Sequence, residues 1–115
     1  MKDRHVESYK RLQHIEQAIN DIERYVENEN LDSFNENDIL HNAVLLQFIV
    51  IGEAIVHIEN EKLDKYDYQW YKARAFRNMI AHEYFNIKME AVWNIIINEL
   101  PSLKAVVLTM LEKEF

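Results

Sequence analysis

The sequence predicts an all-α protein, an antiparallel bundle of four to five helices that forms a single domain over residues 1–115. A chain of 115 residues has the length of one domain that can bury its own core. Glycine and proline occur once each, so the chain holds little of the turn chemistry that β-hairpins need. Apolar residues recur at spacings of three and four, which is the period of an amphipathic helix.

The first two predicted helices cover residues 3–29 and 38–61. The first has one apolar stripe, made of Leu12, Ile15, Ile19, Ile22 and Val26. The stretch NENLDSFNENDI that follows is rich in Asn, Asp and Ser, which predicts a linker and a helix start near residues 35–38. The second helix is apolar on nearly every side, so we expect it to be central in the bundle or to lie at an interface.

Two residues in the middle of this second helix stand out. Gly52 is the only glycine, and a glycine inside a helix costs about 1 kcal/mol relative to alanine. We therefore expect another backbone or a ligand to pack closely against it. Glu53 follows inside the apolar run, where a carboxylate should have a partner, and either Arg74 or Arg77 could supply it.

The remaining helices are predicted over residues 67–82 and 88–99, with an open question at Pro101. Proline favours the first turn of a helix, so residues 101–113 form either a fifth helix or a kinked continuation of the fourth. The residues expected to face the core from these two helices are Ala73, Phe76, Ile80, Ala91, Val92, Ile95 and Ile96.

Composition and charge exclude several classes of protein. The chain has no cysteine, which excludes disulfides and thiolate chemistry and favours a cytoplasmic location. The charged N-terminal stretch lacks the apolar core of a signal peptide, and the longest apolar run is too short to span a bilayer, so we expect no membrane association. The net charge of −7 argues against nonspecific coating of nucleic acid, but residues 65–88 carry +3.

That basic segment contains the stretch FRNMIAHEYF, residues 76–85, whose polar side chains form a candidate site. On an ideal helix Arg77 and His82 point about 140° apart, whereas Arg77 and Tyr84 are about 20° apart. Convergence of the three therefore requires that the helix end or loosen near His82. The alternative is convergence across a symmetric dimer in which each subunit contributes one copy to a shared cleft.

A wider set of residues resembles a known family. The arginine–asparagine pair, the histidine four residues after it and the tyrosine two further on combine with the stretch IGEA at residues 51–54 and with Trp93, Leu100 and Pro101. Together they resemble the HepT branch of the HEPN-domain proteins, over residues 43–103. Position 75, often glycine in relatives, is alanine here, which should affect packing rather than chemistry.

The resemblance implies a function. Such proteins are all-helical homodimers, and many are endoribonucleases that need no metal or cofactor, with the arginine and histidine of two subunits lining one cleft. HepT proteins are toxins whose cognate antitoxin is a small nucleotidyltransferase that can transfer AMP from ATP to the signature tyrosine. In this chain that tyrosine is Tyr84.

The chemistry of these side chains agrees with cleavage of RNA, which supplies its own nucleophile, the 2′-hydroxyl. His82 suits general acid–base catalysis near neutral pH, and Arg77 can bind the scissile phosphate through two hydrogen bonds. Asn78 could orient either group, with Glu53 as a further supporting residue. Lys72 and Arg74, close to Arg77 in sequence, are candidates to contact RNA phosphates.

Three hypotheses compete: a ribonuclease, a catalytically silent partner and substrate of a nucleotidyltransferase, and a structural interaction domain in which the motif is incidental. A di-metal site is rejected, because Glu53 and His57 have no matching second pair. Ordinary structural roles are expected for His41, His57, Trp70 and Trp93, the histidines hydrogen-bonded or at an interface and the tryptophans in core or dimer contacts.

Overall fold

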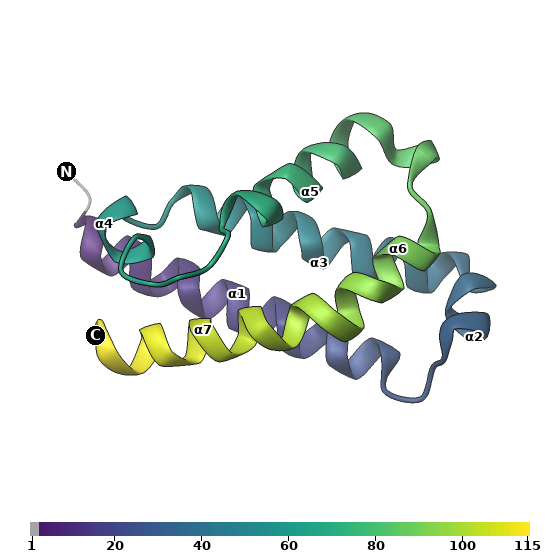
Figure 1. The fold of residues 1–115 in the computed structure, drawn as a ribbon, viewed down its shortest axis with the longest axis horizontal. Coiled ribbons are helices and arrows are strands. Elements are labelled where there is room, and N and C mark those ends of the chain that lie inside the picture. The colour runs from purple at the N-terminus through teal and green to yellow at the C-terminus, as the bar shows by residue number, and fades with distance from the viewer. Residues whose placement is uncertain (1–2) are drawn as a thin grey trace.

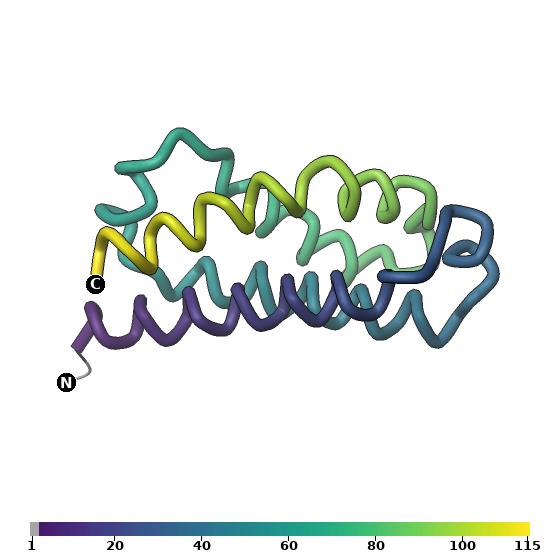
Figure 2. The backbone as a smooth tube through the Cα atoms, turned by 90° about the horizontal axis from the view of Figure 1, so that it is seen from below, coloured from purple at the N-terminus to yellow at the C-terminus, as the bar shows by residue number. Residues whose placement is uncertain are grey.

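The computed structural model describes residues 3–115, and within this range every regular element is helical. Four long helical segments run alternately in opposite directions along the molecule (Figures 1 and 2). Three are α1 (Arg4–Val26), α3 (Asp38–Val56) and α5 (Tyr71–Glu83). The fourth is a continuous path of α6 (Met89–Asn94), the π-helical turn η2 (Ile95–Glu99) and α7 (Leu100–Lys113). The predicted all-α bundle is confirmed for the single chain.

Short helices fill the connections between the long segments. They are α2 (Leu31–Asn35), α4 (Asn60–Leu63) and the 3-10 turn η1 (Tyr84–Asn86). The predicted start of the second long helix is confirmed, because α3 begins at Asp38 and the Asn37 side chain caps it by accepting a hydrogen bond from the Leu40 amide. The predicted linker before it contains α2, which a reciprocal capping pair of Asn30 and Ser33 starts.

Three of the long helices are shorter than the sequence predicted, each mainly at one end. The first ends at Val26, and the second ends at Val56, followed by a turn and α4. The third begins at Tyr71, because the segment before it is held in another conformation: the buried indole of Trp70 donates to the Leu63 carbonyl at 3.1 Å. This hydrogen bond between residues seven apart depends on tertiary packing, which the helical periodicity does not contain.

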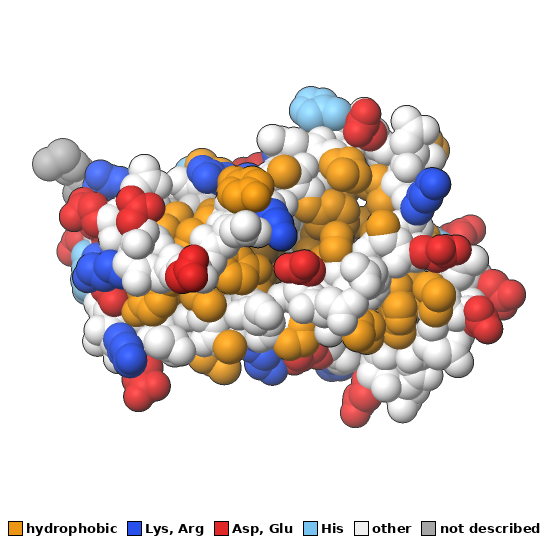
Figure 3. Space-filling view, in the orientation of Figure 1, with side chains coloured by type: hydrophobic (Ala, Val, Ile, Leu, Met, Phe, Trp, Pro, Cys, Tyr) orange, Lys and Arg blue, Asp and Glu red, His pale blue; other side chains and the backbone are white. Residues whose placement is uncertain are grey.

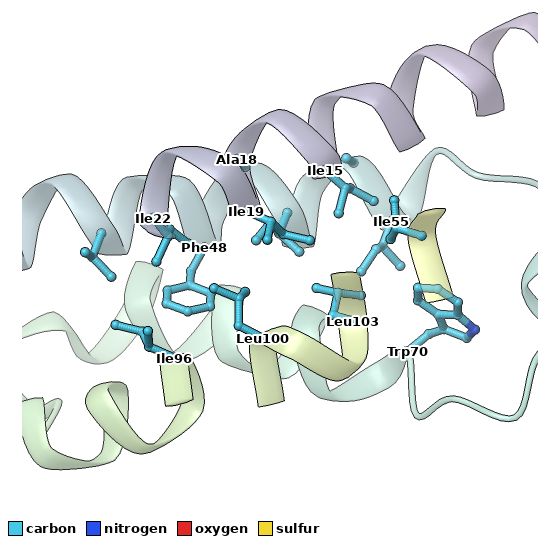
Figure 4. Packing of buried hydrophobic residues seen from close by; sticks show 14 of the residues in the cluster. Ile15, Ala18, Ile19, Ile22, Phe48, Ile55, Trp70, Ile96, Leu100 and Leu103 are labelled. Carbon is cyan, nitrogen blue, oxygen red and sulfur yellow. The ribbon is translucent and has the colours of Figure 1, made fainter. Parts of the chain in front are cut away.

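The core lies where α1, α3 and the α6–α7 path meet (Figure 4). The predicted stripe of α1 is buried from Leu12 to Ile22, with Val26 partly buried at its end. In the later helices Ile80, Val92 and Ile96 are buried as predicted, but Ala91 is exposed and the prediction for it was wrong. His41 has a hydrogen bond between its Nε2 and the Phe34 carbonyl oxygen at 2.5 Å, as expected for a structural histidine.

The central position of α3 explains its composition. It packs against both α1 and α5 (Figure 1). By length and composition alone, α3 and the path Met89–Lys113 are apolar enough to cross a bilayer, which the sequence analysis did not anticipate. The core helix of a bundle meets the same test, so this is weak evidence of membrane insertion.

The question raised by Pro101 is answered in favour of a continuation. Pro101 lies in the first turn of α7, a position at which the fixed φ angle of proline fits a helix. The helix is already irregular before it, since the π-helical turn η2 inserts extra backbone between α6 and α7. Residues 89–113 therefore form one interrupted helix.

Candidate active site

The candidate site is built where α3 and α5 make their closest approach, at Gly52. A Cβ atom added to Gly52 would overlap the Cβ of Arg77 and would lie 3.0 Å from the Ala73 carbonyl oxygen. Both obstacles are backbone or near-backbone atoms, so they cannot swing aside. The predicted close packing at Gly52 is thus confirmed, and its neighbour is the helix that carries the candidate arginine.

This approach places Arg77 against the next residue of α3. The Arg77 Nε lies 2.5 Å from Glu53 Oε1, a close ion pair in which the N–H is not aligned for a hydrogen bond. The structure therefore assigns Arg77, not Arg74, as the partner that the sequence left open. Arg77 Nη1 also donates to the Asn78 Oδ1 at 3.2 Å. Two neighbours thus fix the guanidinium group, which remains about one-third exposed.

A second contact joins α3 to the end of α5. The hydroxyl of Tyr84, the first residue of η1, donates a hydrogen bond to Asn42 Oδ1 near the start of α3. Asn42 and Glu53 are eleven residues apart, about three helical turns, so they lie on one face of α3. Sequence reasoning missed Asn42. The available signal was a polar residue in a stripe of α3 that is otherwise largely apolar.

His82 lies in the last turn of α5 and is exposed. It is four residues after Asn78, which places the two side chains on neighbouring turns of one helix face. The helix ends one residue later, close to where the sequence required it to end or loosen. However, α5 remains regular from Arg77 to His82, so these two side chains point about 140° apart within one chain. The fold therefore does not bring the side chains of Arg77 and His82 together within one subunit.

The remaining candidates lie on different sides of α5. Arg74 is exposed one turn before Arg77. Lys72 borders a mainly apolar pocket of about 150 Å³, together with Tyr68 and Glu99. Burial raises the pKa of Tyr68, and the nearby Glu99 carboxylate adds to this shift. Hydrophobic side chains gather between α5 and the α6–α7 path on this face (Figure 3). Lys72, five residues before Arg77 on α5, thus points about 140° away from it.

No group of three or more acidic, histidine or cysteine side chains within residues 3–115 is arranged to hold a metal ion. The groups along the α3–α5 contact are instead the guanidinium of Arg77 with a carboxylate and an amide, and a phenol–amide pair about three helical turns away on α3, while His82 is exposed at the end of α5. These groups can bind an anion and exchange a proton.

Comparison with known proteins finds relatives that are named as ribonucleases. The chain is 28% identical over 104 residues to a protein of Caldanaerobacter subterraneus subsp. tengcongensis named "Putative RNase", covering 90% of this chain and 93% of that one. It is 28% identical over 94 residues to the "Probable ribonuclease HepT" of Thermococcus cleftensis, covering 81% and 86%. No solved structure gives a significant match.

A third relative is longer. It is the "Gamma-glutamylcyclotransferase and putative RNase" of Methanocaldococcus jannaschii, and it is 29% identical to this chain over 103 residues. The aligned residues cover 89% of this chain but 46% of that protein, so the chain spans about half of its length. The family model described as "Ribonuclease HepT-like" matches residues 15–110, which include all of the site residues discussed above. The chain therefore belongs to the HepT-like ribonuclease family.

Proposed function

We propose that this protein is a metal-independent endoribonuclease that acts as the toxin of a toxin–antitoxin pair. The observation that carries the proposal is the arrangement of Arg77, held by Glu53 and Asn78, with His82 on the turn next to Asn78. A partly exposed, oriented arginine and an exposed histidine on the same helix are the groups that phosphodiester cleavage needs, and the family membership supports the same reaction.

In the proposed reaction the 2′-hydroxyl of RNA attacks the adjacent phosphorus. His82 accepts the 2′-hydroxyl proton, the bond from phosphorus to the 5′-oxygen breaks, and that leaving oxygen takes a proton from water. The products are a 2′,3′-cyclic phosphate and a 5′-hydroxyl. Arg77 stabilises the additional negative charge on the phosphoryl oxygens, and Arg74, one turn away, would contact a neighbouring phosphate. Lys72 would contact an RNA phosphate only if the bound strand extended round α5 to the side that carries Lys72.

We further propose that the active unit is a homodimer with a shared cleft. Because Arg77 and His82 diverge on α5, a second copy is needed to bring an arginine and a histidine to one phosphate. The face of α3 that presents Asn42 and Glu53 also leaves apolar side chains exposed, with Ile39 83% and Leu46 56% exposed. These positions are spaced seven apart, so they form a stripe that a second helix can cover.

We expect Leu46→Asp to break this dimer, because it places a charge in the apolar stripe of both copies. Light scattering should give the wild type twice the 13.9 kDa chain mass at micromolar concentration, and the variant a single chain mass. Ile97→Asp is the matched control, since Ile97 is 52% exposed on η2, away from α3, and should stay dimeric. A monomeric wild type at this concentration would contradict the shared cleft.

The proposed antitoxin is a nucleotidyltransferase that modifies Tyr84. The phenolic oxygen attacks the α-phosphorus of ATP, the bond to pyrophosphate breaks, and the phenolic proton passes to a base of the transferase. Tyr84 is 41% exposed, so the residue lies at the surface, where a partner protein can bind it. The attached AMP adds bulk and negative charge beside Arg77, which would repel RNA.

The experiment that tests the proposed function is cleavage of a mixed-sequence RNA by the pure protein in EDTA, beside Arg77→Ala. We expect the wild type to cut the RNA and leave cyclic phosphate ends, and Arg77→Ala to leave it intact. No cleavage by either protein would overturn the ribonuclease proposal in favour of a silent partner and substrate of the transferase.

A further inference from the structure

Residues 81–86, which include the end of α5, lie outside the core. All six are exposed, and Phe85 is 96% exposed, whereas Ile80 before them is buried and Ile87 after them packs against the core. Phe85 contacts only its neighbour Tyr84 among the described aromatic rings, at a centroid distance of 5.4 Å. Within residues 3–115, a single side-chain hydrogen bond joins η1 to another element, and it runs from Tyr84 to Asn42.

Asn42 is well placed to act as an anchor for this segment. It belongs to α3, whose neighbours Val44 and Leu45 are fully or almost fully buried, so its backbone is rigidly held in the core. Tyr84 follows α5 directly, and His82 is two residues before it, in the last helical turn. The terminal turns of a helix fray when nothing holds the residues that follow the helix. A hydrogen bond at Tyr84 restrains those residues.

We propose that Asn42 is a positioning residue: by holding the Tyr84 hydroxyl it keeps the last turn of α5 formed and His82 oriented for catalysis. This inference rests on the proposed ribonuclease function. It gives Tyr84 a role before any modification, as the link between the core helix α3 and the segment that carries His82.

The same hydrogen bond gives modification of Tyr84 a second effect. Asn42 Oδ1 is an acceptor, and the phenolic hydrogen is the donor that it needs. In the phosphodiester formed with AMP, the tyrosine oxygen is bonded to phosphorus and carries no hydrogen. The bond to Asn42 is then lost, so adenylylation releases the end of α5 in addition to blocking the cleft. Loss of the Tyr84 hydroxyl alone should reproduce the release.

The first test is amide hydrogen exchange of the full chain, for the wild type, Asn42→Ala, Tyr84→Phe and the double variant. A hydrogen bond of ordinary net strength predicts that amides 82–87 exchange about two- to tenfold faster in each single variant. The double variant should exchange no faster than the single ones, because both remove the same bond. Asn20→Ala, at an exposed position of α1, is the matched control and should exchange like the wild type.

Wild-type exchange at these amides in both single variants would overturn the proposal, as would additive effects in the double variant. The first result would mean that another contact, such as a second subunit covering Phe85, holds the segment. This test does not depend on catalysis, so it decides whether the bond holds α5 even if the protein cuts no RNA. In that case the proposed function, and not the anchoring by Asn42, would be wrong.

The second test separates positioning from general structural damage. Asn42→Ala and Tyr84→Phe should lower kcat for RNA cleavage by a similar factor, with little change in KM. Asn42→Asp keeps an acceptor oxygen at the same place, so it should restore kcat while its charge raises KM. Three results would each overturn the role assigned to Asn42. They are failure of Asn42→Asp to restore kcat, a change in KM alone for Asn42→Ala, and full activity of Tyr84→Phe.

Discussion

His82→Ala is expected to lower the rate of RNA cleavage by about 10²–10⁴-fold, the contribution typical of a general acid–base group. The folded structure should be unaffected, because His82 is exposed and is not part of the hydrophobic core. The measurement is the single-turnover cleavage rate of a mixed RNA in EDTA, with thermal unfolding recorded on the same samples.

His14→Ala is the matched control for this prediction. His14 is also exposed on a helix, but it lies on α1, outside the α3–α5 contact. It should cleave RNA at the wild-type rate. If His82→Ala cleaved at the wild-type rate, the acid–base role would have to move to another residue. If it lost activity together with its unfolding transition, the loss would report on folding instead.

Gly52→Val is expected to reduce both stability and activity. The added side chain would meet the Arg77 Cβ and the Ala73 carbonyl, so α3 and α5 must separate. Overpacking of this kind costs about 1–3 kcal/mol of folding free energy. Separation of the helices would also withdraw Arg77 from Glu53 and displace its guanidinium group, so cleavage should fall even in the fraction that remains folded.

Denaturant unfolding and the cleavage rate below the unfolding transition measure the two effects separately. Ala105→Val, at an exposed position of α7, is the control for placing a β-branched residue in a helix. Its helix-propensity penalty is at most about 0.7 kcal/mol. The predicted steric role of Gly52 would be refuted if Gly52→Val were as stable as this control. Gly52→Ala should lie between the wild type and the valine variant in both measurements.

Periodicity alone predicted most of the helices and much of the core. The stripe of α1 and the apolar character of α3 follow from the sequence, because burial of an apolar face against its neighbours dominates the folding of such a bundle. The ends of the helices were less predictable. The start of α5 at Tyr71 follows the hydrogen bond of Trp70 to Leu63, and the π-helical turn η2 interrupts the fourth long segment. Neither leaves a local pattern in the sequence.

The site was predicted in part for a similar reason. The residue types around Arg77 and His82 suggested phosphodiester chemistry, and Gly52 indicated a close contact of two helices. Which arginine pairs with Glu53 depends on the rotation of α5 against α3, which only the three-dimensional packing at Gly52 decides. Asn42 escaped notice because a single amide is common near the start of a helix, and its partner Tyr84 is 42 residues away.

The most direct test of metal-independent RNA cleavage compares two strands of one sequence, RNA and its 2′-O-methyl form. Each strand is incubated with the wild-type protein in EDTA. We predict that the RNA is cut to fragments ending in 2′,3′-cyclic phosphates, identified by mass spectrometry, and that the methylated strand stays intact, because it lacks the attacking hydroxyl. Cleavage of both strands, or of neither, would contradict a metal-independent ribonuclease that uses the 2′-hydroxyl as its nucleophile.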